Sequence, residues 1–348
     1  MITLWLQMLG PLAWAGASGG QFPSLNAQSF HPSLDSTSML WTDDSAVASG
    51  GFHFRSLLSY TNDPLVYTFN DGQRVGLVSD LMQLDLMPSW RFGIGRSRAR
   101  IGLDMPLFAL ARTADIASPG FGDLRVDGKV AFLDAAVAAV GVGVDAGVGL
   151  PIGVLRGLRA EEITWDASMI LDKQVDASRI AVNLGMRGGP RRALENIALN
   201  DALTVRLGYA YALDRVTFLP AARSAARSAA RSAGRSAGCS LELTAMQPLT
   251  SSFTDPAALS AEWMLGGWLR SGDLVLRAGA GTGLTHGVGT PDLRAVVGVG
   301  YERAAGPPDW DHDGVPNRDD GCDRDREDHD GVNDTDGCPE LDAADRVD

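Results

Sequence analysis

The residues best suited to chemistry lie near the end of the chain, in the acidic stretch DWDHDGVPNRDDGCDRDREDHDGVNDTDGCPE at 309–340. The phrase DHDGV occurs in it twice, at 311–315 and 328–332. Carboxylates at this density repel one another unless a cation lies among them. Alternate aspartates followed by a glycine are the pattern with which a short loop surrounds a hard cation with oxygen ligands. The stretch therefore predicts metal binding through oxygen atoms.

The first copy offers a full ligand series for such a loop. In loop order, the candidates are Asp309, Asp311, Asp313, the carbonyl of Val315, Asn317 and Asp320. Gly314 stands where the loop must turn sharply. Calcium suits this set better than magnesium, because calcium accepts about six to eight oxygens in irregular geometry and magnesium requires a near-ideal octahedron.

The second copy is less regular. Arg326 occupies the first ligand position, so Asp325 has to reach in from one residue earlier. The remaining candidates are Asp328, Asp330, the carbonyl of Val332, Asp334 and Asp336. No helical pattern flanks either copy, which argues against a pair of EF-hand helices. A merely solvated, disordered acidic tail is the alternative, but the repeated glycine and alternate aspartates favour calcium.

Each copy closes with the triplet Asp-Gly-Cys, which places Cys322 and Cys338 at matching points. This arrangement predicts a disulfide, worth about 3 kcal/mol for a loop of this length, and hence an oxidising compartment. Zinc held by the thiols with His312 and His329 is the alternative. It is disfavoured because both histidines stand at a loop position that points outward and no C-x-x-C spacing is present.

The motif D-x-D-x-D-G-V-P-N-x-D-D-x-C, followed by D-x-x-D-x-D-G-V-x-D-x-D-G-C-P, resembles the thrombospondin type-3 calcium repeat over 309–340. In bacteria, this repeat commonly links an outer-membrane barrel to a peptidoglycan-binding domain. The resemblance therefore implies calcium as the bound ion and a barrel in the preceding part of the chain.

The acidity is confined to the tail. The formal charge is −13, and residues 309–348 carry sixteen Asp or Glu against four Arg, a net of −12. The remaining 308 residues hold 26 basic and 27 acidic side chains. A body this close to neutral has no basic face for nucleic acid, so no nucleic-acid partner is expected.

The opening MITLWLQMLGPLAWAGASGG is an apolar run followed by small residues, with A-x-A cleavage sites at 13–15 and 15–17. It predicts a secretory signal peptide over 1–17, although no positively charged region precedes the apolar run apart from the amino terminus. A signal-anchor helix is the alternative, disfavoured by the glycine and proline content and by the short length. Export agrees with the predicted disulfide.

The middle of the chain is rich in glycine and alternates at period 2. In DLRAVVGVGYER, residues 293, 295, 297, 299 and 301 are apolar and share one face, while small and charged residues share the other. The apolar run at 134–155 resembles a membrane helix in composition, but its glycines and Asp145 favour a strand instead. No βαβ pattern surrounds the Gly-x-Gly runs, which disfavours dinucleotide binding.

About twelve strands are predicted. Their ranges are 49–60, 75–92, 99–110, 121–133, 137–150, 161–173, 178–188, 201–213, 239–249, 258–270, 273–284 and 292–303. Many reach about ten residues, enough to cross a bilayer when tilted, and the connections alternate between long and short, as in outer-membrane barrels. We therefore predict an all-β fold, an antiparallel transmembrane barrel over 40–305 with both termini in the periplasm, followed by an irregular calcium-binding tail at 306–348.

One connection breaks this rhythm, the repeat AARSAARSAARSAGRSAG at 221–238. We interpret it as a low-complexity insertion. The alternative is a helix with an arginine stripe that contacts an anionic surface.

The stretches NDPLVYTFNDGQRVGLVSDLMQLDL, FGDLRVDGKVAFL and GLTHGVGTPDLRAVVGVGYER resemble the N-terminal barrels of OmpA-type proteins from deltaproteobacteria. The likeness spans roughly 30–340 and implies the outer membrane of a Gram-negative bacterium. The sequence departs from the family after Pro339, where it stops within ten residues without a peptidoglycan-binding domain. Cell-wall anchoring is therefore not carried over, and a periplasmic or cell-wall contact of the tail is only an expectation.

Three function classes compete. We predict a structural, OmpA-like barrel with outer-membrane lipid and calcium as its partners; a narrow channel or uptake barrel and a barrel hydrolase are the alternatives. The predicted barrel offers only His53 and His286 as catalytic histidines, so we predict no enzyme activity.

The charges expected to face the lumen nearly balance. The acids are Asp85, Asp104, Asp127, Asp166, Asp172, Glu262 and Glu302, and the bases are Arg125, Lys129, Arg187, Arg206, Arg277 and Arg294. Balanced charges can pair across a lumen, and a barrel of about twelve strands lies between the filled eight-stranded and the open sixteen-stranded kinds. We predict a narrow or plugged lumen without strong ion selectivity.

Overall fold

The structure is a computed structural model. It describes residues 31–36, 38–47, 51–68, 74–95, 97–113, 119–155, 158, 160, 162–189, 192–194, 197–199, 201–213, 235–250, 258–302, 313–315, 319–322, 324–328, 333 and 335–339. No helix in these residues has the length and apolar character that a membrane-spanning helix requires.

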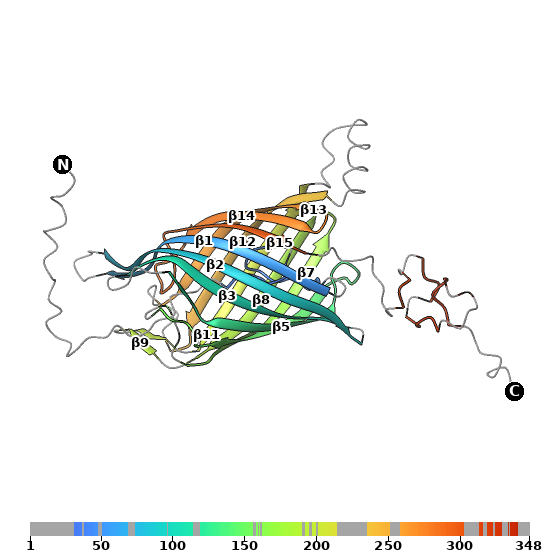
Figure 1. Ribbon diagram of the computed structural model, residues 1–348, viewed down its shortest axis with the longest axis horizontal. Helices are drawn as coiled ribbons and strands as arrows, with labels where there is room; N and C mark the ends of the chain where they lie inside the picture. The colour runs from blue at the N-terminus through green and yellow to red at the C-terminus, as the bar shows by residue number, and fades with distance from the viewer. Residues whose placement is uncertain are drawn as a thin grey trace, which may run out of the picture.

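Twelve antiparallel strands form one closed wall (Figure 1). They are β1 (Gly51–Thr68), β2 (Arg74–Ile94), β3 (Ser97–Thr113), β5 (Leu124–Leu133), β6 (Gly141–Leu150), β7 (Thr164–Val175), β8 (Ser178–Gly188), β11 (Ala202–Ala212), β12 (Arg235–Pro248), β13 (Ser260–Ser271), β14 (Leu274–Gly283) and β15 (Leu293–Tyr301). Three short strands are accessory: β4 (Gly120–Phe121) pairs with β3, and β9 (Arg192–Leu194) pairs with β10 (Ile197–Leu199). The predicted barrel and its strand number are confirmed.

The barrel closes where β1 pairs with β15. The register runs from Phe54 opposite Tyr301 to Asn62 opposite Leu293. Every neighbouring pair around the wall is antiparallel, so none of the twelve wall strands is left with an unpaired edge. Closure satisfies the backbone groups of the strands without water, which a barrel in lipid requires.

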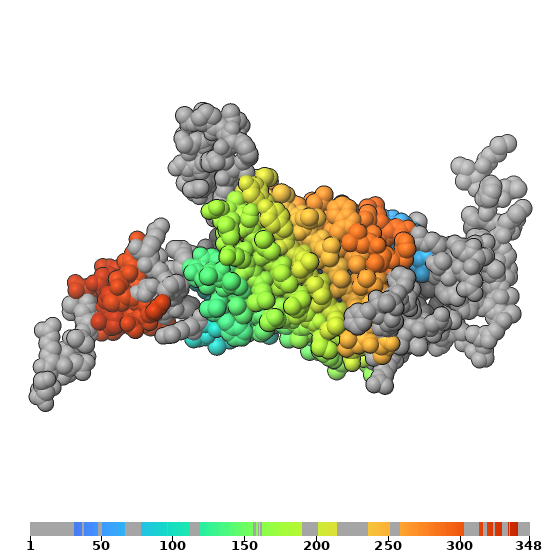
Figure 2. All heavy atoms as spheres, turned by 180° about the vertical axis from the view of Figure 1, so that it is seen from behind, coloured from blue at the N-terminus to red at the C-terminus, as the bar shows by residue number. Residues whose placement is uncertain are grey.

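Side chains alternate between an apolar outer face and a polar inner face. Outward residues such as Leu265 and Val297 are each 54% exposed, whereas the inward Lys129 and Glu242 are each 1% exposed. The space-filling view shows the strands of one face packed side by side (Figure 2). Large apolar side chains on the outside and charges on the inside suit a barrel surrounded by lipid.

The two ends of the barrel differ in their connections. At one end, which we call the turn end, only two residues separate β2 from β3, β7 from β8 and β13 from β14. At the other, which we call the loop end, the connections are mostly longer, as at 151–163 and 189–201. The predicted rhythm of long and short connections therefore holds only in part. The connection predicted to be long at 61–74 is short, because β1 runs to Thr68 and β2 begins at Arg74, and the turn-end connection predicted at 134–136 runs to residue 140.

The start of β1 and the end of β15 both lie at the turn end, as an even number of strands requires. The expectation that both termini are periplasmic concerns residues outside the described ranges. The predicted insertion at 221–238 is only partly described, and its last residues, 235–238, belong to β12.

If the outer face contacts lipid, a charge placed there should destabilise the barrel according to its depth. We expect Leu207→Arg, at the middle of β11, to lower the free energy of unfolding by about 2–4 kcal/mol, and Leu274→Arg, at the first residue of β14, by about 0–1 kcal/mol. Denaturant titration in bilayers, followed by heat-modifiable migration on gels, measures both. Equal costs at the two positions would contradict a membrane-embedded outer face.

Candidate functional site: a plugged lumen

The described residues of 31–47 form no strand and run through the lumen; we call them the plug. At the loop end, His31 lies 3.4 Å from Arg187, next to the last residue of β8. At the turn end, the carbonyl of Val47 accepts a hydrogen bond of 3.2 Å from Arg98, near the start of β3. The chain therefore crosses the barrel from the loop end to the turn end before β1 begins.

The plug has no strand partner, so its backbone amides need other acceptors. Its sequence, HPSLDSTSMLWTDDSAV, lacks the period-2 alternation of the wall strands. Glu242 of β12 supplies acceptors for three of them: its carboxylate accepts hydrogen bonds from the amides of Leu40, Trp41 and Thr42 at 2.6, 2.8 and 2.8 Å. One buried wall acid thus holds the middle of the plug.

Further wall side chains hold the plug backbone on either side of Glu242. The amide of Asp43 donates to Asn183 Oδ1 at 2.8 Å, and Asn183 Nδ2 donates back to the carbonyl of Asp43 at 2.9 Å. Arg55 donates to the carbonyl of Ser36 at 2.7 Å, and Asp172 accepts from the amide of Ser45 at 3.0 Å. These contacts come from β1, β7 and β8, so the plug is tied to several sides of the wall.

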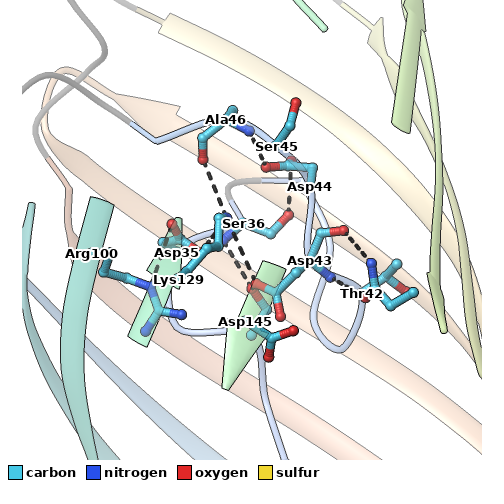
Figure 3. Close-up of polar contacts among 12 residues, drawn as sticks. Asp35, Ser36, Thr42, Asp43, Asp44, Ser45, Ala46, Arg100, Lys129 and Asp145 are labelled. Atoms are coloured by element: carbon cyan, nitrogen blue, oxygen red, sulfur yellow. Dashed lines mark hydrogen bonds and ion pairs between the residues drawn. The ribbon is translucent and has the colours of Figure 1, made fainter. Parts of the chain in front are cut away.

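Ion pairs add a second set of contacts (Figure 3). Lys129 Nζ lies 2.8 Å from Asp35 Oδ1 and 3.9 Å from Asp43 Oδ1. Arg100 Nε lies 3.6 Å from Asp35. Arg179 Nη1 lies 3.0 Å from Asp44 Oδ2. The plug thus places three buried aspartates against cations of the wall.

Apolar plug residues fill the space between these polar contacts. Leu34, Leu40 and Trp41 join a buried cluster with Leu57, Met87, Met264 and Val296 of the wall. Met39 joins another with Ala181, Ala210, Trp268 and Val275. Full burial of such side chains contributes about 1.5–3 kcal/mol each, so apolar packing adds to the polar anchoring.

Inward glycines leave room for the plug. A Cβ at Gly208 would lie 2.9 Å from Cβ of Thr42, and one at Gly141 would lie 2.7 Å from Cβ of Ser45. Any larger residue at these positions would displace the plug or the strand. Some of the glycines in the wall strands are therefore required because the plug lies close against the strand backbone.

The wall carries more cations than acids. Among the described strand side chains together with Glu302, twelve cationic and nine acidic groups face inward. The cations are Arg55, Arg91, Arg98, Arg100, Arg125, Lys129, Arg179, Arg187, Arg206, Arg270, Arg277 and Arg294; the acids are Asp85, Asp104, Asp127, Asp145, Asp166, Asp172, Glu242, Glu262 and Glu302. The three aspartates of the plug bring the acids to the same number.

The wall charges that pair with each other do so between nearby strands. Arg294 Nε lies 3.0 Å from Glu262, and Arg125 Nη2 lies 2.6 Å from Asp166. The sequence predicts that wall charges pair with each other across the lumen. In the structure they pair with charges on nearby strands or with the plug.

The loop end is narrowed by an apolar cluster of Leu65, Val78, Leu81, Phe108, Leu155 and Leu158. Asp123 fixes the connection that carries the last two, because its carboxylate accepts the amides of Gly153 and Ala160 at 3.1 and 2.5 Å. The lumen is thus filled by the plug and also narrowed on the side of β1, β2 and β3.

The predicted calcium tail is described in part. Asp313, Val315, Asp320, Asp325, Asp328 and Asp336 lie within the described residues, and Asp309, Asp311, Asn317, Asp330, Val332 and Asp334 lie outside them. The predicted disulfide between Cys322 and Cys338 is present, with Cα atoms 4.9 Å apart. Gly314 has a φ of 101°, which agrees with the predicted sharp turn.

The two copies of the tail motif share one local structure and touch each other. In each Asp-Gly-Cys triplet, the aspartate carboxylate accepts the cysteine amide: Asp320 at 2.8 Å and Asp336 at 3.1 Å. Asp313 Oδ2 of the first copy accepts the amide of Glu327 in the second at 3.3 Å. The amide of Gly321 likewise donates to the carbonyl of Asp336 at 2.8 Å, so two hydrogen bonds bring the copies together.

Two buried carboxylate oxygens of the tail, Asp320 Oδ2 and Glu327 Oε2, have no hydrogen-bond partner among the described residues. Such oxygens fit a hard cation, which needs acceptors that carry no proton. Glu327 is 3% exposed and was not among the predicted ligands. Its position next to the predicted ligand Asp328 was the only hint in the sequence that Glu327 could be a ligand. Its burial could not be predicted, because it depends on how the two copies pack together.

Two other candidate sites do not assemble. Asp127, Asp145 and Asp166 bring carboxylate oxygens within 4.8 Å of one another, but Arg125 is paired with the first and the third of them. His53 lies near the turn-end start of β1, whereas His286 lies in a loop-end connection. The two histidines considered for a hydrolase therefore do not share one site.

No protein-family profile matches the sequence, and no curated protein matches it. Solved structures do match. The COG4313 outer membrane channel from Pseudomonas putida F1 aligns with a TM-score of 0.51 and 13% identity over 74% of this chain and 96% of that chain. The beta domain of the Bordetella autotransporter BrkA gives 0.41 and 13% over 74% and 100%. The outer membrane protein OpdK from Pseudomonas aeruginosa gives 0.29 and 10% over 72% and 97%.

The fold is that of an outer-membrane β-barrel. It supports a location in the outer membrane of a Gram-negative bacterium and contact with the lipid there.

If Gly208 is required for the plug to fit, a larger residue should loosen the plug without opening the wall. We expect Gly208→Val to speed hydrogen exchange of the amides of Leu40, Trp41 and Thr42, because the new side chain collides with Met39 and Thr42. Mass spectrometry of the folded barrel measures the exchange. Gly128→Val, where a Cβ has its nearest neighbour at 3.9 Å, is the matched control and should leave the exchange unchanged. If the amides of the plug exchange slowly in both variants, the plug does not require glycine at position 208.

Proposed function

We propose that the protein is an outer-membrane channel that its own plug closes at rest. The observation that carries the proposal is the anchoring of residues 31–47 in the lumen through side chains of the wall, with Glu242 at the centre. The similarity of the fold to an outer membrane channel supports it. We also propose that the turn end faces the periplasm, as short connections do in such barrels.

The nature of the contacts favours a removable plug over a permanent filling. A structural barrel can fill its lumen with wall side chains that pair among themselves. Here the acids within ion-pair distance of Lys129 and Arg206 all belong to the plug, within the part of the chain that the structure describes. Because the acids that neutralise these wall cations lie on a separate segment, that segment can leave the lumen and water or solute can take its place.

The proposal predicts that weakening one anchor opens the channel. Glu242→Gln removes the charge that three plug amides share, and a hydrogen bond to a charged group contributes about 1.5–3 kcal/mol. A loss of about 2 kcal/mol would raise the open fraction roughly thirtyfold. Single-channel recording in planar bilayers should show rare openings of the native protein and frequent openings of the variant.

Asp166→Asn is the matched control, since Asp166 pairs with Arg125 of the wall. It makes the same change of acid to amide without touching a plug contact and should keep the channel closed. Asn183→Ala weakens a different anchor and should also open it. If Glu242→Gln folds, exposes the plug to protease and still passes no current, the barrel is structural.

A structural, OmpA-like role with a calcium-binding tail is the second candidate. The disulfide, the paired Asp-Gly-Cys turns and the unpartnered oxygens of Asp320 and Glu327 favour calcium in the tail. The residues proposed to hold calcium are the predicted ligands of the two copies, joined by Glu327. Calcium would supply the positive charge that lets so many carboxylates lie together.

Calorimetric titration of the full chain with calcium should then show about two sites. We expect Asp311→Ala to weaken the tighter one, because it removes a ligand of the complete series. Arg326→Asp should strengthen the weaker one, because a cation there opposes the incoming ion. Asp342→Ala removes one negative charge, as Asp311→Ala does, but lies outside both copies and serves as the control for that variant. Absence of binding heat at millimolar calcium would leave the tail a solvated acidic segment.

A further inference from the structure

We infer that the opened lumen prefers small anions, with carboxylates as the favoured class, and that they bind where the plug aspartates lie in the closed state. The inference rests on the proposed channel function. The binding surface is a cationic strip on the wall, formed by Arg100 of β3, Lys129 of β5, Arg179 of β8 and Arg206 of β11.

Lys129 is the centre of this strip. Its side chain is fully buried, and its acidic partners are Asp35 at 2.8 Å and Asp43 at 3.9 Å (Figure 3). A buried ammonium that loses its partner is left with an uncompensated charge, which is strongly unfavourable. When the plug leaves, water or an anionic oxygen must take the place of these carboxylates.

The other cations extend the strip around the same side of the barrel. Arg179 lies 3.0 Å from Asp44, and Arg206 lies 4.0 Å from Asp43. In the strand order, β11, β8, β7, β6, β5 and β3 follow one another, so the four cations belong to one continuous half of the wall. Each plug carboxylate therefore marks a position that a carboxylate from solution fits chemically.

Wall acids offset this strip only in part, although Asp145 of β6 stands opposite Lys129 in the β5–β6 register. Asp127 pairs with Arg100 and Arg125, and Asp172 lies 3.5 Å from Arg179. Lys129 and Arg206 keep no wall acid within ion-pair distance among the described residues. Loss of the plug removes three acids from a lumen where twelve inward cations face nine wall acids. Cationic side chains that line a pore select for anions, and low-dielectric walls strengthen the effect.

The test must release the plug and leave the wall native. We expect the triple variant Asp35→Asn, Asp43→Asn and Asp44→Asn to do so, because it removes the plug side of every ion pair with the wall and changes no wall residue. In planar bilayers with a gradient of potassium chloride, the reversal potential of this variant should lie closer to the equilibrium potential of chloride than to that of potassium. Succinate added at constant ionic strength should reduce the chloride current by occupying the strip.

Adding Lys129→Gln to the triple variant should remove most of the chloride preference and most of the block by succinate. Lys173→Gln makes the same charge change on an exposed, outward position of β7 and should alter neither. Glu242→Gln provides a second way to release the plug if the triple variant does not fold.

The outcomes separate the two proposals. An open channel that passes potassium and chloride equally, or that keeps its preference and its block after Lys129→Gln, overturns the anion strip and leaves the channel standing. Folded variants with a protease-accessible plug that pass no current overturn the channel, and the strip with it.

Discussion

The lumen of this barrel depends on a single constraint: polar backbone that is not part of a strand must find its partners inside the wall. Strand pairing satisfies the wall itself, but residues 31–47 bring their own amides and carbonyls into the same space. Glu242 meets this need most economically, since one carboxylate accepts three consecutive amides. A neutral side chain could not do so with equal strength, because hydrogen bonds to a charged acceptor are about twice as strong.

The composition of the inner wall follows from that constraint. A buried acid needs cations nearby, and a segment with three aspartates needs more, which accounts for the surplus of arginine and lysine on the inward face. The backbone of the plug must also come close to the strands, so glycine replaces larger residues at Gly141 and Gly208. Charge and shape of the wall are thus both complementary to the plug.

Much of the barrel could be predicted from the sequence, because alternation is a local property. The twelve strands, their order and part of the rhythm of connections follow from period 2 and from turn residues, and Asp127 and Lys129 were correctly placed on the inner face. The plug could not be predicted in the same way. HPSLDSTSMLWTDDSAV has no period, and its partners Asn183 and Glu242 lie far away in sequence. The predicted barrel range even begins at residue 40, within the plug. In the tail, the Asp-Gly-Cys spacing was enough to predict the disulfide, whereas the burial of Glu327 arises from contact between the two copies.

The plug also changes what strand parity implies. An even number of strands places Gly51 and Tyr301 at the same end, yet His31 lies at the other end because the chain crosses the lumen first. That crossing is held by ion pairs and hydrogen bonds together with two apolar clusters, and these contacts respond differently to the surroundings. Apolar packing offers no charge to a solute, whereas on our proposal a carboxylate from solution takes the place of Asp35 beside Lys129, 2.8 Å away in the closed state. The groups that close the lumen are therefore the same groups that a charged solute would compete for.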